Sequence, residues 1–392
     1  MKFRMVFSFL LSPFSFNPAL RSFPPSHLGN SSKFDCTRFG VGSPFSFNPA
    51  LRSFPPSHLG NSSKLDCTRF GVGSPFSFPL MHGIVIRNTG SWYEVRTDDG
   101  RILECKVKGN FRLRGIRSTN PVAVGDGVTV REGAAGEAAF ITEIDERRNY
   151  IIRKASNLSK QSHILAANVD LAVLVITIAR PETTTTFIDR FLASAEAYRV
   201  PVVLLFNKMD DLTEEEKSMA DYLMAMYRLV GYECFAASAL REEGIDALRE
   251  IMKGKTTLLA GHSGVGKSTL MNVLIPGANV KTAAISDAHG AGMHTTTFSE
   301  LRDLPFGGSI IDIPGIKGFG TFNMEPEEVA HYFRDIFAIS HDCRFNNCMH
   351  INEPGCAVLE ALENHQLAPS RYASYLSMLE DKEEGKYRAG MK

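Results

Sequence analysis

The sequence has no excess of either charge. Lysine and arginine total 43, aspartate and glutamate also total 43, and the formal net charge is zero. Overall charge therefore gives no argument for nucleic acid, and any such surface must come from local clustering. Tryptophan occurs once, and the seven cysteines are an odd number with uneven spacing, which argues against a disulfide framework.

No apolar run reaches the roughly 20 residues that a membrane-spanning helix needs. The opening stretch MKFRMVFSFLLSPFSF resembles the front of a secretory signal, but no small-residue cleavage site follows it. The sequence therefore predicts a cytoplasmic protein without a membrane span, with secretion as the disfavoured alternative. A chain of 392 residues, 44% of them hydrophobic, is long enough for two or three domains with apolar cores.

The first part of the chain is a repeat without the period of a helix or a strand. Residues 12–42 recur as residues 43–73 with one change, Leu65 in place of Phe34. The unit is rich in proline, glycine, serine and asparagine, whereas each unit of a solenoid carries a helix or strand. We expect residues 1–80 to be disordered or not natively translated, with a functional tail as the alternative.

From residue 81 the sequence changes to short alternating runs that are typical of strands. The runs GIVIRNTG, WYEVRT, RILECKV, GVTVRE and AAFITEI lie within residues 81–150, separated by turn signals such as TDDG and VGDG. Such a set predicts a small β-barrel of the oligonucleotide-binding (OB) kind.

The predicted barrel carries a local cluster of basic residues. Against the single acid Glu104 stand Arg101, Lys106, Lys108, Arg112, Arg114 and Arg117. The cluster is either a solvated loop or a surface that contacts the phosphates of RNA. Because few aromatic residues are present to stack on bases, we expect recognition of RNA shape and backbone.

Residues 155–322 have the pattern of a doubly wound α/β domain. The apolar runs VDLAVLVITIA and VPVVLLF suit strands buried on both faces of a parallel sheet, and helical stretches alternate with them. Ligands of such sheets bind at the carboxyl ends of the strands, where the polar motifs of this segment stand.

The stretch GHSGVGKST is a phosphate-binding loop between a strand and a helix. Its glycines let backbone N–H groups turn toward phosphate oxygens, Lys267 reaches the β- and γ-phosphates, and the Ser268 hydroxyl binds magnesium. The predicted nucleotide contacts are Gly261, His262, Ser263, Gly264, Val265, Gly266, Lys267, Ser268 and Thr269.

The stretch FNKMDD predicts recognition of guanine. Asp210 would accept hydrogen bonds from the ring N–H and the amino group of guanine, a pair of donors that adenine lacks. Asn207 would brace the loop, and the aliphatic stem of Lys208 would cover the base. Ser238 and Ala239 would add a backbone N–H to the guanine oxygen.

Two further stretches are candidates for switch segments. In DIPG, Asp312 would hold magnesium through water and the Gly315 N–H would sense the γ-phosphate. In HGAGMHTTT, Thr296 would bind magnesium only while the γ-phosphate is present, so residues 282–297 form a candidate order–disorder switch. A plain threonine-rich loop is the alternative.

The chemistry of hydrolysis requires help from elsewhere. Ile316 follows DIPG, where Ras-like enzymes have a glutamine, and a hydrocarbon cannot orient water. We therefore expect slow intrinsic hydrolysis. Lys267, Thr296 and His294 are the candidate catalytic residues, and a surface histidine without a role is the alternative for His294.

The order of the motifs along the chain is unusual. The guanine motif precedes the phosphate loop, whereas most GTPases have the reverse order. The sequence thus predicts a circularly permuted GTPase, which remains able to assemble its site because the termini of such folds often lie close together.

The C-terminal segment, residues 323–392, is predicted to be a helical domain built around a metal. The spacing Cys343-x4-Cys348-x-His350-x5-Cys356 supplies three thiolates and one imidazole. That donor set suits one closed, structural zinc site. Unrelated buried cysteines are the alternative.

These features together resemble the RsgA/YjeQ family of permuted GTPases, over about residues 81–381. The resemblance rests on the barrel, the motif order, GHSGVGKST, HTTT, DIPG and the cysteine–histidine spacing. It implies a late checkpoint in maturation of the small ribosomal subunit, contacts with ribosomal RNA, and GTP hydrolysis stimulated by the subunit. Apart from the resemblance, we expect a monomer that binds GTP and GDP and has no membrane partner.

Two other functions stay open at this point. The first is a GTP-gated tether for RNA or protein whose hydrolysis is incidental. The second is an ATP-dependent enzyme, against which Asp210 argues.

Overall fold

The computed structural model of the chain describes residues 79–107, 121–133, 138–154, 162–280, 299–313 and 324–389. The repeat of residues 12–73 lies outside these ranges, and so does the candidate switch of residues 282–297.

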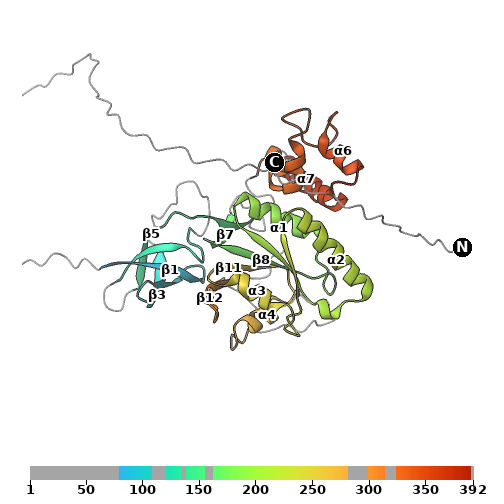
Figure 1. Cartoon of the computed structure of the whole chain (residues 1–392). Coiled ribbons are helices and arrows are strands. Elements are labelled where there is room, and N and C mark those ends of the chain that lie inside the picture. The colour runs from blue at the N-terminus through green and yellow to red at the C-terminus, as the bar shows by residue number, and fades with distance from the viewer. Residues whose placement is uncertain are drawn as a thin grey trace, which may run out of the picture. The chain divides into compact units, whose positions relative to one another are not determined.

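The first five strands form a closed barrel (Figure 1). They are β1 (Leu80–Asn88), β2 (Tyr93–Thr97), β3 (Ile102–Val107), β4 (Gly127–Arg131) and β5 (Ala139–Ile144). Because β1 pairs with both β2 and β4, the order β1-β2-β3-β5-β4 closes on itself. Alternate side chains fill the interior, where Val85, Val95, Val128 and Ile141 are fully buried. The five predicted strands and the OB-like barrel are confirmed.

A two-stranded ribbon follows the barrel, and the sequence did not predict it. β6 (Tyr150–Lys154) pairs antiparallel with β7 (Ser162–Ala167). The register shifts between Ile151 and Ile152, and both of these adjacent side chains are buried. Such an irregularity removes the strict alternation by which a half-buried strand is recognised in a sequence.

The central sheet has the predicted α/β architecture. Its strands are β8 (Leu171–Ile176), β9 (Val202–Phe206), β10 (Glu233–Ala236), β11 (Thr256–Ala260), β12 (Glu300–Asp303) and β13 (Ser309–Asp312). In space the order is β10-β9-β8-β11-β13-β12, and only β12 and β13 pair antiparallel. Arg87 of β1 pairs with Glu300 of β12, so the barrel and the sheet are continuous.

Helices cover both faces of the central sheet (Figure 1). On one face lie α1 (Thr185–Ala197) and α2 (Glu214–Leu229), and on the other α3 (Ile245–Met252) and α4 (Lys267–Leu274). Leu174 of β8 packs with α1 and α2, whereas its neighbour Val173 packs with α3 and α4. A strand that is buried on both faces has the continuous apolar run seen in the sequence.

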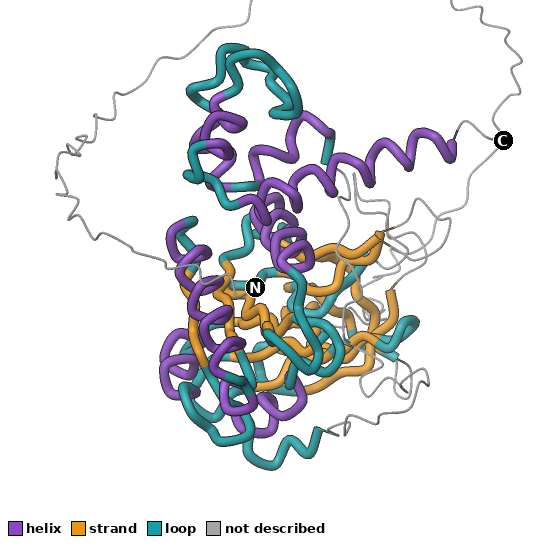
Figure 2. Tube along the Cα trace, turned by 90° about the vertical axis from the view of Figure 1, so that its right-hand side faces the viewer, coloured by secondary structure: helices purple, strands orange, loops and turns teal. Residues whose placement is uncertain are grey.

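The described C-terminal part consists of helices joined by loops (Figure 2). They are the 3-10 helix η2 (Pro326–Tyr332), α5 (Arg334–Ser340), α6 (Ala357–Glu363) and α7 (Pro369–Ala389). Val329, Phe333, Val358 and Tyr375 form a core of their own, and α7 also packs against α1. Among the residues described, no helix combines the length and the apolar character needed to cross a membrane.

Candidate active site

The predicted nucleotide motifs lie at one edge of the central sheet. β9 leads into Asn207, β11 leads into Gly261, and β13 ends at Asp312. β8 lies between β9 and β11, and β13 follows β11, all of them parallel. Their carboxyl ends therefore meet at the same edge, and the permuted chain order does not separate the motifs in space.

Asn207 connects the guanine motif to the other two nucleotide loops. The residue is 2% exposed. Its Nδ2 donates to the carbonyl oxygen of Val265 at 2.8 Å, and its Oδ1 accepts from the backbone N–H of Ala239 at 3.0 Å. Ser238 is buried beside it, and its Oγ accepts from the N–H of Arg241 at 3.1 Å. One buried amide thus fixes the phosphate loop and the Ser-Ala loop relative to each other.

Glycine is required at two positions of the phosphate loop. Gly266 has a φ of +101°, and a Cβ at this residue would lie 2.3 Å from Asn207 Nδ2. Gly261 has a φ of +144°, and a Cβ there would lie 2.8 Å from the carbonyl oxygen of Val175. The phosphate loop therefore packs directly on the guanine motif and on β8, without room for a larger residue.

Lys267 begins α4, where the lysine of a phosphate loop is expected. Its ammonium donates to the carbonyl oxygens of Gly261 at 2.7 Å and His262 at 2.8 Å. Burial lowers the pKa of Lys267 to about 8, and the Asp312 carboxylate offsets part of this effect. A buried ammonium held by neutral carbonyls is suited to binding an anion.

The guanine motif places Lys208 and Asp210 in different surroundings. Lys208 is left-handed, with a φ of +63°, and burial lowers its pKa. Asp210 lies on the 3-10 turn η1 (Met209–Asp211), and its side chain is 9% exposed. Asp210 Oδ2 is 3.8 Å from Arg241 Nε. A ligand with two adjacent N–H groups would therefore meet a largely desolvated acceptor.

The remaining loop residues differ in exposure. Ser263 and Gly264 are exposed, whereas Val265 is buried. The half-buried His262 ring has its Nε2 at 2.7 Å from Thr183 Oγ1 and its Nδ1 at 3.0 Å from the Ser263 carbonyl.

The structure places some of the predicted magnesium and switch residues. Ser268 and Thr269 lie in the first turn of α4, and Asp312 at the end of β13 is 9% exposed. The other predicted residues at this site, Gly315, Thr296 and His294, lie outside the described residues.

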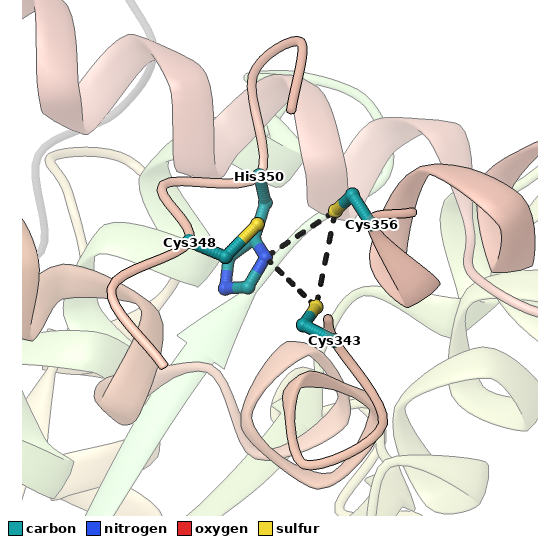
Figure 3. A group of neighbouring side chains, drawn as sticks. All are labelled: Cys343, Cys348, His350 and Cys356. Carbon is teal, nitrogen blue, oxygen red and sulfur yellow. Dashed lines mark hydrogen bonds between the residues drawn. The ribbon is translucent and has the colours of Figure 1, made fainter. Parts of the chain in front are cut away.

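The four predicted metal ligands come together in the loops between α5 and α6 (Figure 3). All their ligand atoms lie within 4.8 Å of one another. His350 Nδ1 is 3.6 Å from Cys343 Sγ and 3.5 Å from Cys356 Sγ, and these two sulfurs are 3.9 Å apart. Burial, and after it the neighbouring Cys356 thiol, raises the pKa of Cys348 to about 12. This group can hold a metal ion that displaces the thiol protons.

Tyrosines of α7 hold the backbone of this cluster. Tyr372 Oη donates to the carbonyl oxygen of His350, and Tyr375 Oη donates to that of Met349, both at 2.7 Å. His350 has a φ of +55°, which is uncommon for a residue with a side chain. The metal-binding group is therefore anchored to the helical core from one side.

Two of the six predicted RNA-binding residues are described. Arg101 is paired with Asp99 and Glu132, with nitrogen–oxygen distances of 2.8 and 2.7 Å. Lys106 is exposed on β3, with its Nζ 4.1 Å from the centroid of the Trp92 ring. Lys108, Arg112, Arg114 and Arg117 lie outside the described residues.

Sequence reasoning missed two residues beside the nucleotide loops. Arg180 and Thr183 follow β8, between the guanine motif and the phosphate loop, and contact Lys208 and His262 respectively. The available signal was their place after a buried apolar run, at the strand end where ligands of α/β sheets bind.

Comparison with known families gives two matches. The model of the RsgA GTPase matches residues 144–322, and that of the RsgA N-terminal domain matches residues 82–140. A protein of Bacteroides fragilis named small ribosomal subunit biogenesis GTPase RsgA is 65% identical over 309 residues, which is 79% of this chain and 99% of that protein. A protein of Porphyromonas gingivalis with the same name is 60% identical over 312 residues, again 79% of this chain and 99% of that protein.

Two solved structures resemble the chain. YjeQ from Thermotoga maritima is 33% identical with a TM-score of 0.61, over 77% of this chain and 98% of that one. YloQ, described as a circularly permuted GTPase, is 28% identical with a TM-score of 0.59, over 78% of this chain and 96% of that one.

Proposed function

Because the chain belongs to the RsgA GTPase family, we propose that this GTP hydrolase binds the small ribosomal subunit and acts late in its maturation. The subunit would stimulate hydrolysis of GTP to GDP and phosphate. The observation that carries the proposal is the pair of hydrogen bonds by which Asn207 joins the phosphate loop at Val265 to the Ser-Ala loop at Ala239. They support one guanine-nucleotide site built from motifs that the chain presents in permuted order.

In the proposed site each loop has one task. Asp210 accepts hydrogen bonds from guanine, and the stem of Lys208 covers the base. The phosphate loop surrounds the phosphates with backbone N–H groups, and Lys267 replaces its carbonyl partners with the β- and γ-phosphates. The buried setting that lowers the pKa of Lys267 makes a phosphate partner more favourable than it would be in water.

Magnesium fits the oxygen donors at this site. The hydroxyl of Ser268, the carboxylate of Asp312 and the hydroxyl of Thr296 would hold it, since magnesium prefers oxygen ligands. Bound there, the ion would neutralise charge on the phosphates. Gly315 would contact the γ-phosphate through its backbone N–H, and residues 282–297 would respond to that phosphate.

His294 is the proposed group that orients the attacking water. The support is chemical: Ile316 is a hydrocarbon, and an imidazole next to the threonine run can accept a proton or a hydrogen bond. Docking on the subunit would bring His294 into place, which is consistent with slow hydrolysis by the protein alone.

Zinc is the proposed metal of the cysteine–histidine group, one per chain and structural. For a tetrahedral ion with Zn–S bonds of about 2.3 Å, two sulfurs are expected roughly 3.8 Å apart. The separation of Cys343 and Cys356 is 3.9 Å, which supports this assignment. Three thiolates and one imidazole leave no position open for water, so the ion would stabilise the loops without taking part in hydrolysis.

Ribosomal RNA is the proposed partner of the barrel and the metal-binding domain. Lys106, exposed beside Trp92, supports a contact with RNA backbone and a base. Arg101, Lys108, Arg112, Arg114 and Arg117 complete the proposed surface.

We propose four segments: residues 1–80, which contain the repeat and are disordered or not natively translated, the barrel 81–150, the GTPase domain 155–322 and the metal-binding domain 323–392. We also propose a cytoplasmic monomer.

GTP turnover by the full chain, alone and with purified small ribosomal subunits, tests this function. We expect slow turnover alone and stimulation of at least a hundredfold, the contribution of a general base that is brought into position. The variant His294→Ala should bind subunits and lose the stimulation. Binding without any stimulation of the unmodified protein would contradict the proposal and favour a GTP-gated tether.

A further inference from the structure

A short bridging segment, residues 180–183, is part of the connection between β8 and α1 and lies between the guanine motif and the phosphate loop. At one end Arg180 contacts the guanine motif, and at the other Thr183 contacts the phosphate loop. These two contacts join groups that are far apart in the sequence, so they are tertiary rather than local.

The Arg180 guanidinium holds the C-terminal end of the guanine motif, at Asp211. It makes two parallel hydrogen bonds to the Glu216 carboxylate, at 2.9 and 2.8 Å. Its Nε donates to Asp211 Oδ2 at 2.9 Å, and its Nη2 also donates to the backbone carbonyl of Asp211. The pKa of Glu216 is lowered to about 2, and the hydrogen bonds from Arg180 are the largest cause. Bidentate pairing gives a fixed geometry as well as attraction.

The backbone of Arg180 contacts the same motif at Lys208. Its carbonyl oxygen accepts from Lys208 Nζ at 2.7 Å. Both residues are left-handed, with φ of +51° for Arg180 and +63° for Lys208, a conformation that side chains disfavour. Such conformations persist where surrounding contacts hold them, often at ligand sites. Lys208 and Asp211 enclose Asp210 in sequence, and both are tied to Arg180.

The other end of the bridging segment meets the phosphate loop. Thr183 Oγ1 lies 2.7 Å from His262 Nε2 and accepts from the backbone N–H of Thr177 at 3.1 Å. The Pro181 ring packs against Gly264, where an added Cβ would lie 3.2 Å from the ring carbons of Pro181. The segment therefore contacts both the guanine motif and the phosphate loop, the two loops proposed to hold opposite ends of the nucleotide.

We propose that Arg180 is a positioning residue for guanine recognition: it holds Lys208 and Asp211 so that the Asp210 carboxylate faces the base. This inference rests on the proposed role of Asp210. Arg180 itself makes no contact with the nucleotide. Its carbonyl aligns the Lys208 stem, and its guanidinium anchors the end of η1 next to the carboxylate that reads guanine.

A general stabilising ion pair is the competing explanation. The Arg180 side chain is 44% exposed, and exposed pairs contribute little to stability, so this explanation predicts a small effect on the fold. The two roles differ in what they change. A pair that only stabilises the fold affects every ligand alike. A residue that aims Asp210 affects GDP more than inosine diphosphate (IDP), which lacks the amino group that Asp210 would bind.

The test is calorimetric titration of the full chain with GDP and with IDP, comparing Arg180→Ala with the unmodified protein. We expect GDP to bind on the order of tenfold more weakly and IDP about threefold, so the preference for GDP narrows. Arg249→Ala is the matched control. Arg249 also pairs with an exposed carboxylate, Asp246 at 2.7 Å, and donates to a carbonyl, that of Val273 at 3.2 Å. The Arg249→Ala variant should leave the affinities for GDP and IDP unchanged.

Equal weakening of GDP and IDP, or no weakening, would overturn the proposal. Absence of a GDP preference in the unmodified protein would instead refute the assignment of Asp210, so the two failures are distinguishable. The variant Glu216→Gln breaks the bidentate pair while keeping Arg180. It should narrow the preference in the same direction, and adding Arg180→Ala should then have less effect than it has alone. Full additivity would contradict a shared role.

Discussion

Arg371 of α7 and Asp189 of α1 form an ion pair that is almost fully withdrawn from solvent. Arg371 Nη1 lies 2.6 Å from Asp189 Oδ1, and the side chains are 1% and 0% exposed. Tyr227 Oη of α2 donates to the same carboxylate oxygen at 2.9 Å, and Asp335 of α5 accepts from Arg371 at 2.8 and 2.9 Å. One guanidinium thus fastens the C-terminal helices to the GTPase domain.

Removing the positive charge of this pair should strongly destabilise the protein. In Arg371→Met the Asp189 carboxylate stays buried without its cation, which costs about 3–5 kcal/mol of unfolding free energy. The double variant with Asp189→Leu removes both charges and should recover much of that loss. Urea unfolding measures both. Arg334→Met is the control, because the Arg334 pair with Glu196 is partly exposed and is expected to contribute at most about 1 kcal/mol. A double variant less stable than Arg371→Met would contradict this account.

The proposed role of Asp210 predicts a change of base selectivity. In Asp210→Asn the amide offers one acceptor and one donor instead of two acceptors, so guanine loses a hydrogen bond and faces a mismatched donor. The preference for GTP over ATP should fall by about a hundredfold in competition binding. Asp221→Asn, an exposed carboxylate on α2, should leave selectivity unchanged. Unaltered selectivity in Asp210→Asn would refute the assignment.

The lowered pKa of Lys267 predicts how GDP binding depends on pH. In the protein without nucleotide, Lys267 has a pKa of about 8. A bound phosphate favours the ammonium form and raises that pKa. Binding then takes up a proton above pH 8. Affinity should be constant below pH 8 and fall above it, by up to about tenfold per pH unit. Calorimetry in two buffers of different ionisation heat should detect proton uptake at pH 8.5. Lys267→Arg should abolish this pH dependence, and a constant affinity in the unmodified protein would contradict it.

Loss of one metal ligand should remove the metal and loosen the loops between α5 and α6. Cys348→Ala leaves two thiolates and one imidazole, which favours release of zinc to a chelator. Elemental analysis should find one zinc in the purified protein and much less than one in the variant. Cys234→Ala, a buried cysteine of β10, is the matched control and should retain the metal. Full zinc occupancy in Cys348→Ala would argue against the site.

The sequence predicted the features that depend on local patterns. Alternating residues identified the five barrel strands, and the continuous apolar run of β8 identified a strand buried on both faces. It missed the ribbon of β6 and β7, because the register shift between Ile151 and Ile152 hides the period of two. It also missed Arg180 and Arg371, whose partners are distant along the chain.

By itself, the sequence was enough to predict the chemistry of the sites: the phosphate loop, the guanine motif and the cysteine–histidine spacing each lie within a short stretch of the chain. Spacing along a chain is enough when all members of a motif lie on one loop. Only the tertiary structure decided how these sites are joined. Asn207 meets Val265, Arg180 meets Glu216, and Arg371 meets Asp189 only after the sheet has formed and helices have packed on it. Long-range contacts of polar groups leave no periodic trace in the sequence, since each depends on where the backbone brings its partner.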